Sequence, residues 1–144
     1  MVVERKVAAG QAILTPRPIQ TPVAGRPSLT GRDLQRYWAG FDRLDESKRQ
    51  AIGQAMAKLT PEMPALIVGR LHSDQPKDRL RALRIATVSG LVQRLGQEVL
   101  ALTGDPDPFV RSCQMTALGR LDGPAGLAVL RRGLHDADLR VRAN

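Results

Sequence analysis

The chain has 144 residues, room for one domain or a short array of repeats, and carries a formal net charge of +8. Valine and isoleucine never alternate with polar residues over a strand length, which excludes an extensive β-sheet. The single cysteine, Cys113, excludes an intramolecular disulfide and a cysteine-based zinc site, and no apolar run approaches the roughly 20 residues that span a bilayer. These features predict a cytoplasmic protein. The charge favours an acidic partner, such as nucleic acid or an acidic protein, although a solvated basic surface gives the same composition.

Residues 1–29 are predicted to form an extended or disordered arm. The segment contains four prolines, and after Glu4 it has no acidic residue. Proline removes helix hydrogen bonds and holds its neighbours extended. Arg17 and Arg26 make this arm basic and are candidate contacts to a partner, with a solvated tail as the alternative.

A helix is predicted over residues 30–44, where Ser28 or Thr30 can cap its start. Three of the four aromatic residues fall on its apolar face: Tyr37, Trp38 and Phe41. The first unit of a repeat stack exposes an apolar end and needs a cap. We expect the three rings to seal that end, and the alternative is an exposed docking site for a partner.

From residue 46 onward the sequence repeats every 31 residues. The units are expected at 46–76, 77–107 and 108–138, with a partial fourth unit at 139–144. Corresponding positions include an alanine column and an aspartate column: Ala55, Ala86 and Ala117, and Asp74, Asp105 and Asp136. Such a period indicates stacked helical units instead of one closed globule. Small residues in the first half of each unit allow two helices to approach closely.

Each unit is predicted to hold two helices. In the first unit, Thr60 and Pro61 are expected to cap and begin the second helix. The middle unit has only Ser89-Gly90 as a break, so a nearly continuous bent helix is one alternative there. The turn aspartates are expected to accept hydrogen bonds from the N–H groups of the following helix. Val110 and Val141 are expected in the core, and Arg111 and Arg142 are expected to reach the aspartate of a neighbouring unit.

The pattern Asp-x-Asp-x-x-Val-Arg at 105–111 and 136–142, together with the alanine column and the unit length, resembles HEAT repeats. It is most similar to the short bacterial type, also described as phycobilisome-lyase-like. The resemblance covers roughly residues 46–144. It implies a right-handed α-solenoid whose concave wall comes from the second helix of each unit.

The same resemblance implies a protein-binding scaffold. Some relatives bind DNA along a basic concave face and some act on bilins, for which this chain has no signature. The fourth unit stops before its helix is complete, which would expose the apolar face of the third unit. We therefore expect either that the chain is the N-terminal part of a longer solenoid or that this end docks onto another subunit.

No phosphate loop, metal-binding helix or nucleophile motif occurs in the sequence, so we expect no enzyme activity, no cofactor and no metal site. The remaining candidates for recognition are basic residues on or near the second helices: Arg70, Arg94, Arg131 and Arg132. The leading hypothesis is a non-enzymatic scaffold that binds a protein partner in a larger assembly. The alternative is a nucleic-acid-binding module that uses these arginines on a basic concave face.

Overall fold

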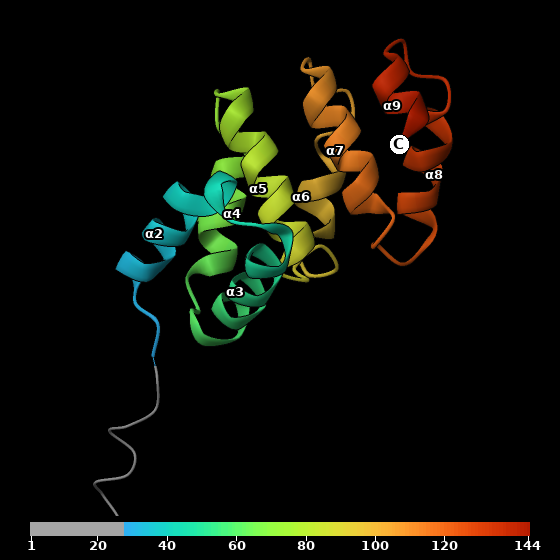
Figure 1. Cartoon of the computed structure of the whole chain (residues 1–144). Helices are drawn as coiled ribbons and strands as arrows, with labels where there is room; N and C mark the ends of the chain where they lie inside the picture. Colours follow the sequence, from blue (N-terminus) through green and yellow to red (C-terminus); the bar gives the residue numbers. More distant parts are fainter. Residues whose placement is uncertain (1–27) are drawn as a thin grey trace, which may run out of the picture.

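The computed structural model describes residues 28–144, and this part of the chain is helical without any strand (Figure 1). The predicted all-α class is therefore confirmed. Except for its last two positions, the predicted arm at 1–29, with Arg17 and Arg26, lies outside the described residues. The elements in chain order are α2 (Gly31–Gly40), the 3₁₀ turn η2 (Phe41–Arg43), α3 (Glu46–Leu59), α4 (Met63–Leu71), α5 (Pro76–Val88), α6 (Gly96–Leu100), α7 (Pro108–Leu118), α8 (Pro124–Gly133) and α9 (Leu139–Ala143).

Most helices begin at a capping side chain or a proline. Thr30 caps α2 in a capping box with Asp33, whose carboxylate accepts a hydrogen bond from the Thr30 N–H at 2.9 Å. Aspartates cap three further helices, and prolines occupy the first position of three: Asp45, Asp107 and Asp138 for α3, α7 and α9, and Pro76, Pro108 and Pro124 for α5, α7 and α8.

One local prediction is wrong, and one alternative that the sequence left open is excluded. Thr60 ends α3 instead of starting α4, because its N–H donates to the carbonyl of Met56 and its buried hydroxyl faces the Met56 sulfur. In the middle unit the helix does not continue through Gly90. This glycine has φ +75°, and the Leu91 N–H donates to the carbonyl of Ala86 at 2.9 Å, which closes α5 with a Schellman-type turn. The second helix of that unit, α6, has only five residues.

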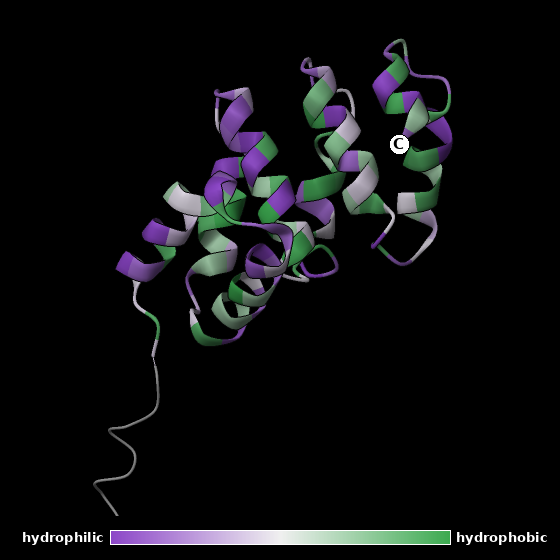
Figure 2. Cartoon of the chain, in the orientation of Figure 1, coloured by the Kyte–Doolittle hydropathy of each residue, from purple (hydrophilic) through white to green (hydrophobic). Residues whose placement is uncertain are grey.

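The helices from α4 onward form two rows. In Figure 1, α5, α7 and α9 stand side by side, and the contacts of α7 with both α5 and α9 agree with that view. The second row consists of α4, α6 and α8, which contact one another and the first row. Hydrophobic and hydrophilic residues alternate along α5 and α7 (Figure 2), as expected for helices with one buried face.

The core lies between these rows. Val110 and Val141 are 0% and 2% exposed, so their predicted core positions are confirmed. Fully buried side chains from four helices share this core: Met63, Ile67, Leu71, Leu83, Ile85, Val99, Val110 and Leu118. One continuous apolar cluster therefore connects the successive helix pairs.

The first unit departs from the expected alanine column. Ala86 and Ala117 are fully buried, but Ala55 is exposed. On α3 the buried positions are Gly53 and Met56 instead. Both α3 and η2 lie beside α5, since α3 packs against it and Asp42 of η2 pairs with Arg81 and Arg84 of α5.

Candidate functional site

Two arginines near the starts of α5 and α7 form bidentate ion pairs with aspartates of the next turn. Arg79 Nε and Nη2 donate to the two carboxylate oxygens of Asp105 at 2.8 and 3.0 Å. Arg111 makes the same pair with Asp136, at 2.9 Å for both bonds. Each arginine also donates through Nη1 to a carbonyl six residues earlier, at 2.8 Å for Arg79 and 2.7 Å for Arg111. Arg111 was expected to reach the aspartate of a neighbouring unit. Its carboxylate partner, Asp136, belongs to the same predicted unit, 108–138, and only the backbone carbonyl of Asp105 comes from the preceding unit. The predicted carboxylate partner is therefore wrong, and these pairs are structural.

The turn aspartates divide two tasks between them. Asp107 and Asp138 cap the following helices, whereas Asp105 and Asp136 each accept the N–H of the residue two positions later, at 2.9 and 2.8 Å. The prediction that Asp105 and Asp136 bind the N–H groups of the following helix is therefore wrong. The aspartates two positions later, Asp107 and Asp138, bind them instead. Arg142 also differs from expectation, since it donates to the carbonyls of its own turn at residues 136 and 137.

The hydrogen bonds of Asp136 change its acidity. The Arg111 guanidinium, then the Asp138 N–H, hold the pKa of Asp136 below its usual value, although burial opposes them. The ionised carboxylate is therefore part of the folded structure.

The three aromatic candidates lie inside the fold. Tyr37, Trp38 and Phe41 are 5%, 6% and 0% exposed, so their rings do not form an exposed docking surface. The Tyr37 hydroxyl donates to the Arg49 carbonyl at 2.8 Å, and burial raises the pKa of Tyr37 to about 12. Arg70 lies over the Trp38 ring at 4.9 Å. These rings therefore hold α2 against the helices that follow.

The four arginine candidates do not line one groove. Arg70 is partly exposed and pairs with Asp78 at 3.0 Å. Arg94, Arg131 and Arg132 are exposed, and each lines a different hollow. These four arginines therefore do not form one continuous wall of cations of the kind that a nucleic-acid backbone would follow.

An open apolar groove lies at the α8–α9 end. It has a volume of about 220 Å³ and lies between α8, α9 and Met115 of α7. Arg131 and Arg142 stand on its rim. We call it the end groove, and its apolar lining residues are Met115, Leu127, Leu130, Leu134 and Val141.

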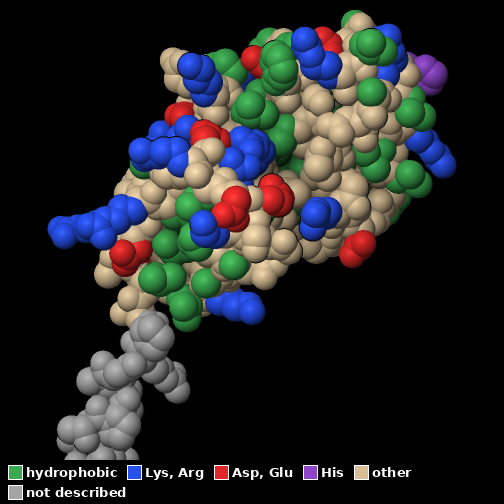
Figure 3. Space-filling model, viewed as in Figure 1, with side chains coloured by type: hydrophobic (Ala, Val, Ile, Leu, Met, Phe, Trp, Pro, Cys, Tyr) green, Lys and Arg blue, Asp and Glu red, His purple; other side chains and the backbone are tan. Residues whose placement is uncertain are grey.

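The end groove combines apolar lining with positive charge. Leu127 and Leu134 are 49% and 63% exposed, and the nearby Leu139 is 69% exposed. Figure 3 shows hydrophobic side chains among basic ones over this end of the molecule. Clustered exposed leucines of this kind mark interaction surfaces more often than scattered ones do.

The sequence contained part of the signal for this groove. The spacing of Leu127, Leu130 and Leu134 predicts the apolar stripe of a helix. It does not say whether a neighbour covers the stripe, which is a property of the packing. The exposed leucines were therefore missing from the sequence-based candidates.

Comparison of the chain with protein-family models, with curated proteins and with solved structures found no match. Within residues 28–144, no helix is both long and apolar enough to cross a membrane. In the same range, no three histidine, cysteine, aspartate or glutamate side chains are grouped as a metal ion would require.

Proposed function

We propose that this chain is a protein-binding scaffold, built as a short α-solenoid of the HEAT type, and that its end groove receives a helix from a partner. The recurring Arg–Asp pair supports the repeat architecture. Arg79 and Arg111 each join the aspartate of the next turn and the carbonyl six residues before them. Identical bonding at two successive turns is the behaviour of units that stack on their neighbours.

The single observation that carries the functional proposal is the open apolar end groove. Helix α5 packs against α7, and α7 packs against α9. At the α8–α9 end, by contrast, Leu127 and Leu134 remain exposed around the groove. Complete burial of one leucine side chain stabilises a complex by about 1.5–3 kcal/mol. A helix with an apolar stripe is the natural occupant, because leucines at i, i+3, i+4 and i+7 fit between two helices.

The positive charge at the rim of the end groove limits which partner helices can bind there. Arg131 and Arg142 line the groove, and no acidic residue does. Arg132 and Arg140 add further positive charge on the neighbouring surface of α8 and α9. A partner helix with glutamates beside its apolar stripe therefore matches the rim, and a lysine-rich helix does not.

A peptide titration tests this proposal. The probe is a labelled helical peptide with leucine at i, i+3, i+4 and i+7 and glutamate on both flanks, and its binding is followed by fluorescence anisotropy. We expect saturable binding that Leu134→Asp weakens at least about tenfold, since the substitution places a charge in an apolar contact. The control is Leu59→Asp on α3, because Leu59 is 41% exposed but does not line the groove.

Three results would contradict the proposal. The first is no binding, or equal weakening by Leu59→Asp and Leu134→Asp. The second is equal affinity for a peptide with lysine in place of glutamate, which would remove the role of the arginine rim. The third is a concentration-dependent dimer of the chain alone that Leu134→Asp abolishes, because the occupant would then be a second copy. Binding of duplex DNA in preference to the peptide at moderate salt would favour the nucleic-acid alternative.

A further inference from the structure

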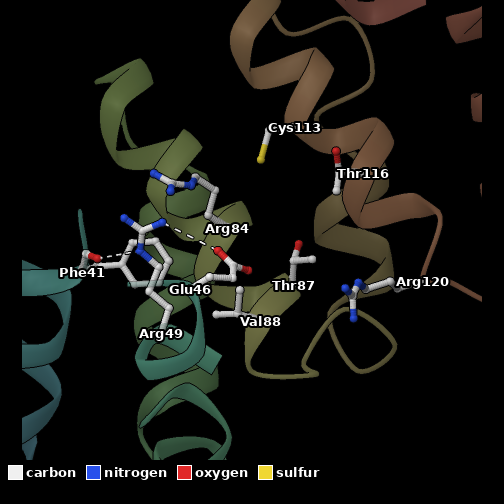
Figure 4. A pocket seen from close by; sticks show the side chains of 9 residues that line it. All are labelled: Phe41, Glu46, Arg49, Arg84, Thr87, Val88, Cys113, Thr116 and Arg120. Atoms are coloured by element: carbon white, nitrogen blue, oxygen red, sulfur yellow. Dashed lines mark hydrogen bonds and ion pairs between the residues drawn. The ribbon is translucent and has the colours of Figure 1, made fainter. Parts of the chain in front are cut away.

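A second pocket lies where η2, α3, α5 and α7 meet (Figure 4). Its volume is about 190 Å³, and three arginines from three separate segments line it: Arg49, Arg84 and Arg120. We call it the arginine pocket. Among the described residues, Glu46 is the only acidic one in the lining, so the three arginines outweigh it in charge.

The guanidinium groups of this pocket have unused donors. Each guanidinium carries five N–H donors. Arg49 uses Nε and Nη2 on the carbonyls of Phe41 and Asp42, at 2.9 Å each, and Arg84 uses Nη1 on the Asp42 carboxylate at 2.8 Å. The side chain of Arg120 makes no hydrogen bond or ion pair with any residue of the described range 28–144, and only its backbone N–H is bonded, to the carbonyl of Ala117. Donors therefore remain for a ligand on both sides of the pocket.

The arrangement is held in place without a ligand. Arg49 and Arg84 lie over the Phe41 ring at 5.1 and 5.2 Å, and the Arg49 side chain is only 17% exposed. In Figure 4 these two arginines lie on one side of the pocket, and Thr116 and Arg120 come from the other side. Two fixed guanidinium groups and one unpartnered arginine across a small hollow favour an oxyanion over a cation.

The rest of the lining limits the size and shape of the anion. Phe41 and Val88 contribute apolar surface beside the charged groups. The volume is below the range of about 300–1,000 Å³ that drug-sized ligands occupy. Because the site is a hollow between helices, it suits a terminal group with several free oxygens better than a diester that continues in both directions.

We propose that the arginine pocket binds a small phosphate monoester, with the phosphoryl oxygens on Arg84 and Arg120 and the ester group against Phe41 and Val88. This site is separate from the end groove and does not depend on the proposed scaffold function. The negative charge of Glu46 opposes anion binding. Its side chain is 77% exposed and only loosely paired with Arg49, at 3.8 Å, so Arg49 does not fully neutralise it.

Phenyl phosphate is the probe, and its binding to the full chain is measured by calorimetry and by amide chemical shifts at constant salt. We expect saturable binding, with shifts centred on the lining of the arginine pocket. Arg120→Gln is expected to weaken binding at least about tenfold, the size of one lost charge-assisted hydrogen bond. Arg94→Gln is the matched control, because Arg94 is exposed, lies outside the pocket and changes the net charge equally. It is expected to leave the affinity within about twofold.

The substitution Glu46→Gln is expected to change the affinity for phenyl phosphate in the opposite direction. Removal of this carboxylate is expected to tighten phenyl phosphate binding, whereas Glu62→Gln, an exposed substitution between α3 and α4, is expected to have no effect. The proposal is overturned by absence of saturation, by equal weakening from Arg94→Gln and Arg120→Gln, or by binding of phenol as tight as that of phenyl phosphate. Equal affinity for dimethyl phosphate would likewise exclude a monoester site. Circular dichroism of each variant verifies that the fold is retained.

Discussion

Arg79 and Asp105, 26 residues apart, form a nearly buried bidentate ion pair with bonds of 2.8 and 3.0 Å. Their side chains are only 11% and 4% exposed. The desolvation of Arg79 is opposed by its hydrogen bonds and by the charge of Asp105, which together raise the pKa of Arg79. A pair of this kind contributes little when compared with apolar packing, but removal of one partner leaves a buried charge unpaired.

Asp105→Asn should therefore destabilise the chain by about 3 kcal/mol, since Arg79 would keep its charge without the carboxylate. Asp74→Asn is the matched control, because Asp74 occupies the same repeat position but is exposed. It should change the free energy of unfolding by less than about 0.5 kcal/mol. Urea denaturation of both variants measures the difference. Equal losses would show that the pair does not hold the turns together.

Because the pKa of Asp136 is lowered in the folded chain, we expect the free energy of unfolding to fall in acid. The ionised form of this carboxylate therefore stabilises the fold. This contribution is fully present above the unfolded value of about 3.9 and disappears as the pH falls through the lower folded value. Asp136→Asn should be less stable than the parent at pH 6, and the gap should narrow as the pH falls below about 4. Urea titrations from pH 6 to pH 2.5 test this, and a gap that does not depend on pH would contradict it.

Two glycines on neighbouring helices should respond oppositely to alanine. A Cβ on Gly53 would lie 2.7 Å from the Tyr37 hydroxyl oxygen and 3.3 Å from Ser89 Cβ. That hydroxyl is already held by the Arg49 carbonyl, so Gly53→Ala should destabilise by about 1–3 kcal/mol. At Gly69 in α4 a Cβ meets nothing within 4 Å, and Gly69→Ala should stabilise by about 0.5–1 kcal/mol. Thermal melts of the two variants should shift in opposite directions, and a shift in the same direction would refute the packing described for α2 and α3.

Part of the burial and side-chain bonding in this helical fold could be predicted from the sequence. The spacing of Val110 and Val141 predicted their burial. The Asp-x-Asp-x-x-Val-Arg pattern predicted that Arg111 bonds to an aspartate, although the carboxylate is that of Asp136 in its own unit instead of a neighbouring one. These relations repeat at a fixed interval, so they are visible as a pattern. Arg79 was missed because it stands one position before the arginine column, and its long side chain reaches Asp105 all the same.

Other features depend on packing that no local pattern encodes. Ala55 matches the alanine column in sequence, but it is exposed, and Gly53 and Met56 are the buried positions of α3. The arginine pocket joins Arg49, Arg84 and Arg120, which fall at unrelated positions of their units. Only the folded arrangement brings them together. The same holds for the end groove, where the leucine stripe was visible but its exposure was not.

The lone cysteine predicts a slow reaction with alkylating reagents. Burial raises the pKa of Cys113 to about 11, although the charge of Arg84 opposes the shift. The thiolate is the reactive form, and an ordinary cysteine has a pKa of about 8.5. At pH 8 the iodoacetamide reaction of the folded chain should be at least about a hundredfold slower than that of the urea-unfolded chain. Its rate should still rise with pH at pH 10, and a plateau near pH 9 would contradict the assignment.

The proposal that the end groove is the partner site is tested most directly by amide hydrogen exchange, with and without the glutamate-flanked helical peptide. A peptide bound in the groove would cover Leu127 and Leu134, which are exposed in the free chain, and the residues of α9 that line the groove. We predict slower exchange within residues 124–144, no change in α3, and no protection at all in Leu134→Asp. Protection centred on α2 and α3, or spread evenly over the chain, would contradict the assignment of this end of the molecule as the binding surface.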